Sequence, residues 1–137
     1  MLYTQLIYGT IIITAVVIFH VAILVFLAML LKRWHDNYSL FDNVKVAAVG
    51  LGTSVFFIIG INTIEAWFWA YIYLLLGEFQ TINDALYFSI STATTVGYGD
   101  VVMSEQWRLL SSFEAMGWWL LFGPSTVFFN GINALCL

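Results

Sequence analysis

The stretch STATTVGYGD, residues Ser91–Asp100, places two glycines and a tyrosine after a run of hydroxyl side chains, in a strongly apolar chain. Backbone at membrane depth needs partners for its N–H and C=O groups. Non-helical backbone persists there only where protein buries it or where it lines a watery path. Gly97 and Gly99 accept positive φ at alternate positions, which lets carbonyl oxygens turn to one side. We therefore expect a non-helical backbone over residues 95–99.

The composition excludes a water-soluble globule. Of the 137 residues, 62% are hydrophobic and 9% are charged, and the mean hydropathy is +0.94. Such a chain has too little polar surface to face water on all sides, so we predict an all-α membrane protein in contact with membrane lipid. The formal charge of −4 and the absence of a basic stripe in the sequence exclude nucleic acid as a partner.

Hydropathy divides this single membrane domain, residues 1–137, into three spans that are each longer than the roughly 20 residues needed to cross a bilayer. The spans are residues 7–31, 46–76 and 106–137. Lys32, Arg33 and His35 precede a short polar loop that ends at Lys45, and the positive-inside rule assigns this loop to the cytoplasm. We therefore expect a multi-pass protein of the cell membrane, with its N-terminus outside and its C-terminus in the cytoplasm. Three glycines of the second span are expected to allow close helix packing: Gly50, Gly52 and Gly60.

The segment between the second and third spans is too polar to cross the membrane and too apolar in its middle for an ordinary loop. Thr81 and Asp84 have the spacing of a capping box, which marks the start of a helix. We predict a half-helix over residues 82–93, about 18 Å long at 1.5 Å per residue. This length reaches halfway through the bilayer, so the segment is expected to re-enter on the side from which it came.

The sequence DALYFSISTATTVGYGD, residues 84–100, resembles the pore helix and selectivity filter of tetrameric potassium channels, in particular small bacterial pore-loop channels. The resemblance covers residues 46–134 and leaves the first span as an extra N-terminal helix. It implies three transmembrane helices, with a re-entrant pore helix and a filter (residues 94–100) between the outer pore helix and the inner helix. The implied protein is a homotetrameric, K⁺-selective ion channel for passive potassium transport, with no enzymatic activity.

The resemblance also implies roles for individual residues. Carbonyl oxygens that replace the water shell of K⁺ are implied at Thr95, Val96, Gly97 and Tyr98, with Gly99 at the outer mouth. The implied filter supports are Tyr87, Phe88, Ser91, Thr94 and Asp100. Tyr87 and Phe88 stand where the family often has two tryptophans, which leaves the Tyr87 hydroxyl as the donor to Asp100. Ser91 stands where some members carry a buried carboxylate, so their inactivation behaviour does not transfer. Permeant K⁺ ions are the only bound groups expected, without a cofactor.

One chain offers one strip of carbonyl oxygens, whereas a cation needs oxygens on all sides. Four copies in a ring supply them, and each half-helix then directs its partly negative C-terminal end at the central cavity. Four acidic residues outnumber Arg108 in the outer segments and are expected either to attract cations or to be plain solvated charges: Glu78, Asp84, Asp100 and Glu105.

His20, Glu65 and Glu114 each fall within a different span, where an ionisable side chain is expensive and is usually paired or functional. Counting from the helix ends places His20 and Glu65 roughly 6–10 Å apart in depth, which leaves a contact between them open. Glu114 is expected at the level of the 82–93 helix. For Glu114 and His20, a role in gating and a purely structural, hydrogen-bonded role remain alternatives.

The third span has three weak points for a helix, Gly117, Gly123 and Pro124. The inner helix of the resembled channels bends to open, so we expect a hinge at Gly123 and Pro124 and a cytoplasmic mouth near residues 130–133. A static kink is the alternative. No span carries the regular arginines of a voltage sensor.

Two other functions stay open. A weakly selective cation channel keeps the same fold, because the missing tryptophan pair removes a brace of the filter. A small membrane subunit of a proton- or metal-handling complex would instead use His20, Glu65 and Glu114 as its working groups.

Overall fold

The computed structural model describes residues 2–38 and 44–135, and this part of the chain is all-helical apart from its loops. Its helices are α1 (Leu2–Tyr38), α2 (Val44–Leu75), α3 (Ile82–Ala93) and α4 (Arg108–Leu135). Residues 136–137, the end of the expected third span, lie outside the described residues together with residue 1 and residues 39–43. The all-α prediction therefore holds for the described part of the chain.

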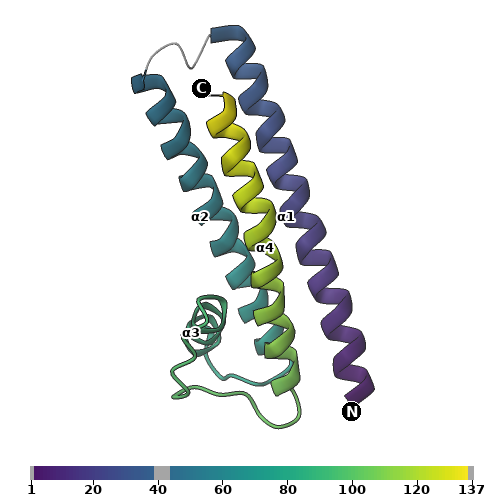
Figure 1. Cartoon of the computed structure of the whole chain (residues 1–137). Coiled ribbons are helices and arrows are strands. Elements are labelled where there is room, and N and C mark those ends of the chain that lie inside the picture. The colour runs from purple at the N-terminus through teal and green to yellow at the C-terminus, as the bar shows by residue number, and fades with distance from the viewer. Residues whose placement is uncertain (1, 39–43, 136–137) are drawn as a thin grey trace.

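The three long helices run alongside one another, and the short α3 lies at one end of them (Figure 1). α4 lies between α1 and α2 in this view, and α3 lies beside the C-terminal end of α2 and the start of α4. The N-terminal end of α1 is at the same end of the molecule as α3, whereas α4 ends at the opposite end.

Within the part of the chain that the structure describes, two helices are apolar and long enough to cross a membrane. The apolar segments are Tyr3–Arg33 within α1 and Gly52–Leu75 within α2. α4 has 28 residues, more than the roughly 20 that a span needs, but its first half carries Ser111, Ser112 and Glu114. These polar residues lower its hydropathy below that of the other two long helices.

The polar segment after the first span is helical as far as Tyr38, and residues 39–43 of the expected loop lie outside the described residues. Lys32, Arg33 and His35 all belong to α1, and Lys45 lies in the first turn of α2. A helix satisfies its own backbone hydrogen bonds in water as well as in lipid, so it continues past the bilayer. Hydropathy marks the end of a span and not the end of its helix.

Glycine provides the close approach between α1 and α4. A Cβ atom at Gly9 would lie 2.5 Å from the Phe113 ring, and one at Gly117 would lie 3.2 Å from Ile13. Such small residues allow helix backbones to pack closely in membranes. The packing role expected for Gly52 and Gly60 is wrong within one chain, because no other described atom lies within 4 Å of a Cβ built there.

Three apolar clusters hold the helices together. Trp69 and Tyr73 of α2 pack with Ala85 of α3 in the cluster that also contains Leu110 of α4. A second cluster joins α1, α2 and α4 through Val16, Ala66, Trp118 and Leu121, and a third joins the same helices through Leu24, Leu27, Ile58, Ile61 and Phe128. The first of these clusters fixes α3 against both helices that flank it in the sequence.

Candidate functional site

The start of α3 is set by the capping box. The Thr81 hydroxyl accepts from the backbone N–H of Asp84 at 3.1 Å and donates to the Asp84 carboxylate at 2.8 Å. Thr81 has extended backbone angles, φ −125° and ψ 148°, as an N-cap residue does. α3 runs from Ile82 to Ala93, the bounds that the sequence indicated.

The backbone turns sharply at the C-terminal end of α3. The Thr94 N–H and hydroxyl both donate to the Ile90 carbonyl, at 3.0 and 2.8 Å. The N–H groups of Val96 and Gly97 then donate to the Ser91 carbonyl, at 3.0 and 3.2 Å. These bonds satisfy carbonyls that the end of a helix leaves without partners. Ser91 and Thr94 therefore hold the stretch that follows α3, in part through their backbone atoms.

The sign of φ alternates along residues 95–99. φ is positive at Gly97 (51°) and Gly99 (78°), as the sequence led us to expect, and also at Thr95 (59°). Thr95 is the only described non-glycine residue with positive φ. Its conformation was missed because a β-branched residue rarely adopts it, and no signal in the sequence marks it.

Tyr87 of α3 tethers the far end of this stretch. Its hydroxyl donates to Asp100 at 2.9 Å, as expected, and its ring stacks on Tyr98 with an interplanar angle of 11°. The Asp100 carboxylate also accepts from the N–H of Val101 at 3.0 Å. The hydrogen bond to Asp100 raises the pKa of the Tyr87 phenol, so the phenol keeps the proton that it donates.

Phe88 supports α3 and contacts α2. Its ring packs edge to face on the ring of Tyr73, with 5.5 Å between the ring centroids. The centroid of the Phe79 ring lies 5.2 Å from that of Phe88. Such aromatic contacts add to the apolar cluster between α2 and α3. Phe88 therefore anchors the helix that precedes residues 95–99.

Glu114 lies at the level of α3, as predicted, and links three helices. Its carboxylate accepts from Ser89 of α3 and from Tyr73 of α2, both at 2.5 Å, and from the Trp118 ring N–H at 3.4 Å. Glu114, Ser89 and Tyr73 are all fully buried. Sequence reasoning missed these donors, although the four-residue spacing of Glu114 and Trp118 on one helix was a visible signal.

A hollow of about 240 Å³ separates the stretch from α4. All of its lining residues except Gly97 and Ala115 carry a hydroxyl group. The lining consists of Ser91, Thr92, Thr95, Gly97, Ser111, Ser112 and Ala115. Polar hydroxyls of this kind suit water or the polar surface of another chain.

Most of the outer acidic residues hold loops. Glu78 accepts from the N–H and the hydroxyl of Ser104, at 2.7 and 2.8 Å, which joins the loop before α3 to the loop after residue 100. Asp84 caps α3 and Asp100 accepts from Tyr87. Glu105 is 91% exposed, and its carboxylate lies 3.9 Å from Arg108. Glu78, Asp84 and Asp100 therefore have structural partners, and the attraction of cations by these four carboxylates stays a prediction.

His20 and Glu65 are in direct contact, a possibility that the sequence had left open. His20 Nδ1 lies 2.9 Å from Glu65 Oε1, and His20 Nε2 lies 3.1 Å from the hydroxyl of Ser125 on α4. His20 and Glu65 are buried, at 0% and 2% exposure. Ser125 was missed because only helix packing brings it here.

The three suspected gating positions of α4 differ in their surroundings. A Cβ at Gly117 would lie 3.2 Å from Ile13 of α1, whereas a Cβ at Gly123 would meet no described atom within 4 Å. Pro124 lies inside α4, which continues as a helix on both sides of it. Proline removes one backbone hydrogen bond at this point.

One comparison with known proteins decides the family. A family model described as ion channel matches residues 6–132, which is most of the chain. The chain belongs to this ion channel family. Neither the search of curated proteins nor that of solved structures finds a match. As an ion channel it is a membrane protein, and family membership indicates a transport protein and not an enzyme.

The ionisable residues of this ion channel do not converge on one point. His20 and Glu65 share one buried cluster, while Glu114 lies in another with Tyr73 and Ser89. Among the side chains that the structure describes, no group of three or more His, Cys, Asp or Glu residues is placed to share a metal ion. The three residues are therefore not one working site for a metal.

Proposed function

We propose that this ion channel is a homotetramer that conducts K⁺ selectively and passively. The alternation of φ along residues 95–99 is the observation that carries this proposal. Alternating φ turns successive peptide units so that their carbonyl oxygens gather on one side, as an ion path needs. K⁺ would bind to the carbonyl oxygens of Thr95, Val96, Gly97 and Tyr98 without any cofactor.

A fourfold ring completes the coordination. The filter residues 94–100 are exposed in the single chain, and Tyr98 is 72% exposed. Neighbouring copies in a ring would cover such surfaces and supply the remaining oxygens. The C-terminal end of α3 would point at the central cavity, where its partial negative charge favours a cation.

The remaining elements then take the parts expected from the sequence. α2 is the outer pore helix, α4 is the inner helix, α1 is an extra helix outside the pore, and the N-terminus lies outside the cell. α1 packs on α4 through Gly9, which places it beside the helix that would move on opening. Gly123 and Pro124 form the hinge, and Glu114 holds α3 behind the filter.

The proposal is tested by K⁺ uptake into proteoliposomes with the wild type and Gly97→Ala. Gly97 has a φ of 51°, which an L side chain adopts only with strain, so the substitution should abolish uptake. Gly60→Ala is the matched control, because Gly60 lies within α2 with no described atom within 4 Å of the added Cβ. Equal uptake by Gly97→Ala and Gly60→Ala would refute the assignment of the filter.

A further inference from the structure

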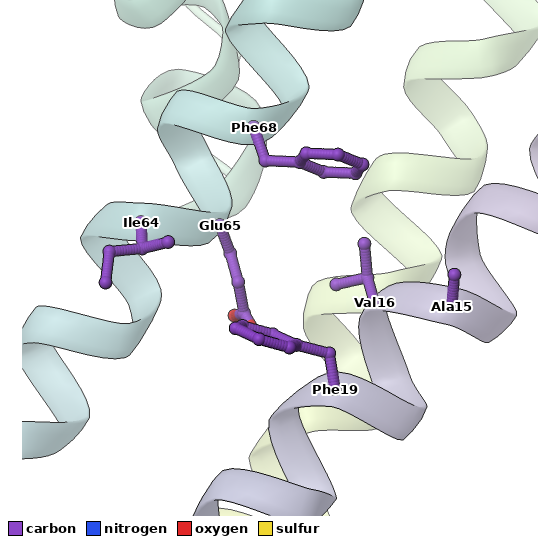
Figure 2. Close-up of a pocket in the computed structure, with 6 residues that line it drawn as sticks. All are labelled: Ala15, Val16, Phe19, Ile64, Glu65 and Phe68. Atoms are coloured by element: carbon purple, nitrogen blue, oxygen red, sulfur yellow. The ribbon is translucent and has the colours of Figure 1, made fainter.

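A pocket of about 290 Å³ lies between α1 and α2, away from the proposed filter. It is lined by Ala15, Val16, Phe19, Ile64, Glu65 and Phe68. Figure 2 shows Glu65 and Phe68 extending from α2 toward α1, where Ala15, Val16 and Phe19 lie. The pocket thus has one carboxylate among apolar side chains.

The pocket has a buried floor and an exposed rim. Val16 and Glu65 are 6% and 2% exposed, whereas Phe19, Ile64 and Phe68 are each about half exposed. Both helices that form it carry the apolar segments long enough to cross a membrane. The rim therefore opens toward the hydrocarbon of the bilayer and not toward water.

One oxygen of Glu65 has no hydrogen-bond partner. Oε1 contacts His20, but Oε2 is buried and meets no donor within the described part of the chain. A buried acceptor without a donor is destabilising, because it has lost its hydrogen bonds to water and gained none in the protein. At this depth no bulk water is available to supply the donor. The site is therefore incomplete in a way that a ligand can complete.

The apolar surroundings of the pocket determine which donor fits. Oε2 has lone pairs that can accept a hydrogen bond, and no donor among the described residues uses them. A cationic donor would have to leave water for the hydrocarbon, which is expensive, whereas a hydroxyl group brings no charge with it. An apolar cavity of about 150 Å³ binds benzene, so this pocket, about twice as large, has room for a longer apolar body.

We propose that this pocket binds a neutral lipophilic alcohol, whose hydroxyl donates to Glu65 Oε2 and whose apolar body packs on Val16, Phe19 and Phe68. Binding acts on α4, because the other oxygen of Glu65 holds His20, and His20 contacts Ser125 next to Pro124. The effect on conduction, unlike the binding itself, rests on the proposed function.

Photolabelling of the channel in proteoliposomes tests the binding. The probe is decan-1-ol with a diazirine in its chain, and labelled residues are mapped by mass spectrometry. Label is expected on residues 15–19 and 64–68. Excess decan-1-ol should reduce it at least tenfold, whereas 1-methoxydecane, which lacks the donor, should not.

Two variants of α1 control for folding. Ala15→Trp fills the pocket while His20 and Glu65 themselves stay unsubstituted, and it should remove the label, whereas Ala22→Trp on the same helix should keep it. Competition by the ether equal to that by the alcohol would show an ordinary lipid contact and overturn the proposal. A lack of label on these residues, as when a neighbouring copy covers the pocket, would overturn it too.

K⁺ flux tests the action on α4. Decan-1-ol should change flux at least threefold in the wild type and in Ala22→Trp, and should leave flux unchanged in Ala15→Trp. Specific labelling with unchanged wild-type flux would overturn the link to α4. A wild type without K⁺ flux would instead count against the proposed function, while the labelling result still decides the binding site.

Discussion

Two carboxylates are buried among the helices of this channel, and their surroundings differ. Both oxygens of Glu114 accept hydrogen bonds, from Ser89 and Tyr73. Glu65 uses one oxygen for His20 and leaves the other without a donor among the described residues. A fully satisfied polar network fixes a structure, whereas a partly satisfied one can accept a further group. Glu114 therefore suits the support of α3, and Glu65 suits a site that responds to a ligand.

Glu114→Leu is expected to have the largest effect. It leaves the buried hydroxyls of Tyr73 and Ser89 without an acceptor, at roughly 1–3 kcal/mol for each. The free energy of unfolding, from denaturant titration of the purified channel, should fall by about 3 kcal/mol, and K⁺ uptake should be lost. Glu105→Gln, which changes a 91% exposed carboxylate, is the control and should change neither quantity. A Glu114→Leu protein as stable as the wild type would remove the difference between the two carboxylates.

The His20–Glu65 pair should behave differently in a double-mutant cycle. Glu65→Leu or His20→Leu alone leaves one buried polar partner and should lower the free energy of unfolding by about 2 kcal/mol. The double variant removes both partners, and an apolar replacement of a buried pair is often nearly neutral. We therefore expect the double variant to be more stable than either single variant. Additive losses would contradict the contact.

Ser125→Ala should have a smaller effect, mainly on gating. The lost hydrogen bond to His20 is worth about 1 kcal/mol, which is small against overall stability. Ser125 lies next to Pro124, so the rates of channel opening and closing should change several-fold in single-channel recordings. Thr126→Ala is the control, because among the described residues the Thr126 hydroxyl bonds only to the Phe122 carbonyl of its own helix. Unchanged rates in Ser125→Ala would separate the buried pair from the hinge.

The hydrogen bond between Tyr87 and Asp100 is exposed, unlike the contacts of Glu114 and Glu65. Its removal is expected to have the smallest effect on the channel. Tyr87→Phe keeps the ring on Tyr98 but removes the donor to Asp100, so K⁺ uptake should fall by less than in Gly97→Ala. Because the bond to Asp100 raises the pKa of Tyr87, the tether is present below the ordinary phenol pKa. It is lost only as the pH rises through the higher pKa of the folded channel. Wild-type uptake should therefore be the same at pH 7 and pH 9. A decline in uptake over this range that Tyr87→Phe abolishes would contradict the raised pKa of Tyr87.

Local signals in the sequence were reliable. Thr81 and Asp84 set the start of α3, and glycine chemistry indicated positive φ at Gly97 and Gly99. These features depend on residues within a few positions of each other. The positive φ of Thr95 was not predictable, because its residue type disfavours the conformation and only the turn around Ser91 imposes it.

Contacts between helices were harder to predict from the sequence. The level of Glu114 was predicted, but its bonds to Tyr73 and Ser89 depend on how α2 and α3 rotate about their axes. The contact of His20 with Glu65 was left open for the same reason. Hydropathy gives the depth of a residue only roughly, and tilt and rotation are set by packing.

The reversal potential of the reconstituted channel tests the central claim most directly. With most of the K⁺ on one side of the bilayer and an equal excess of Na⁺ on the other, conduction through carbonyl oxygens of residues 95–98 predicts a reversal potential close to the K⁺ equilibrium potential. A reversal potential near zero in the same gradient would show that K⁺ and Na⁺ pass alike, and would contradict the account.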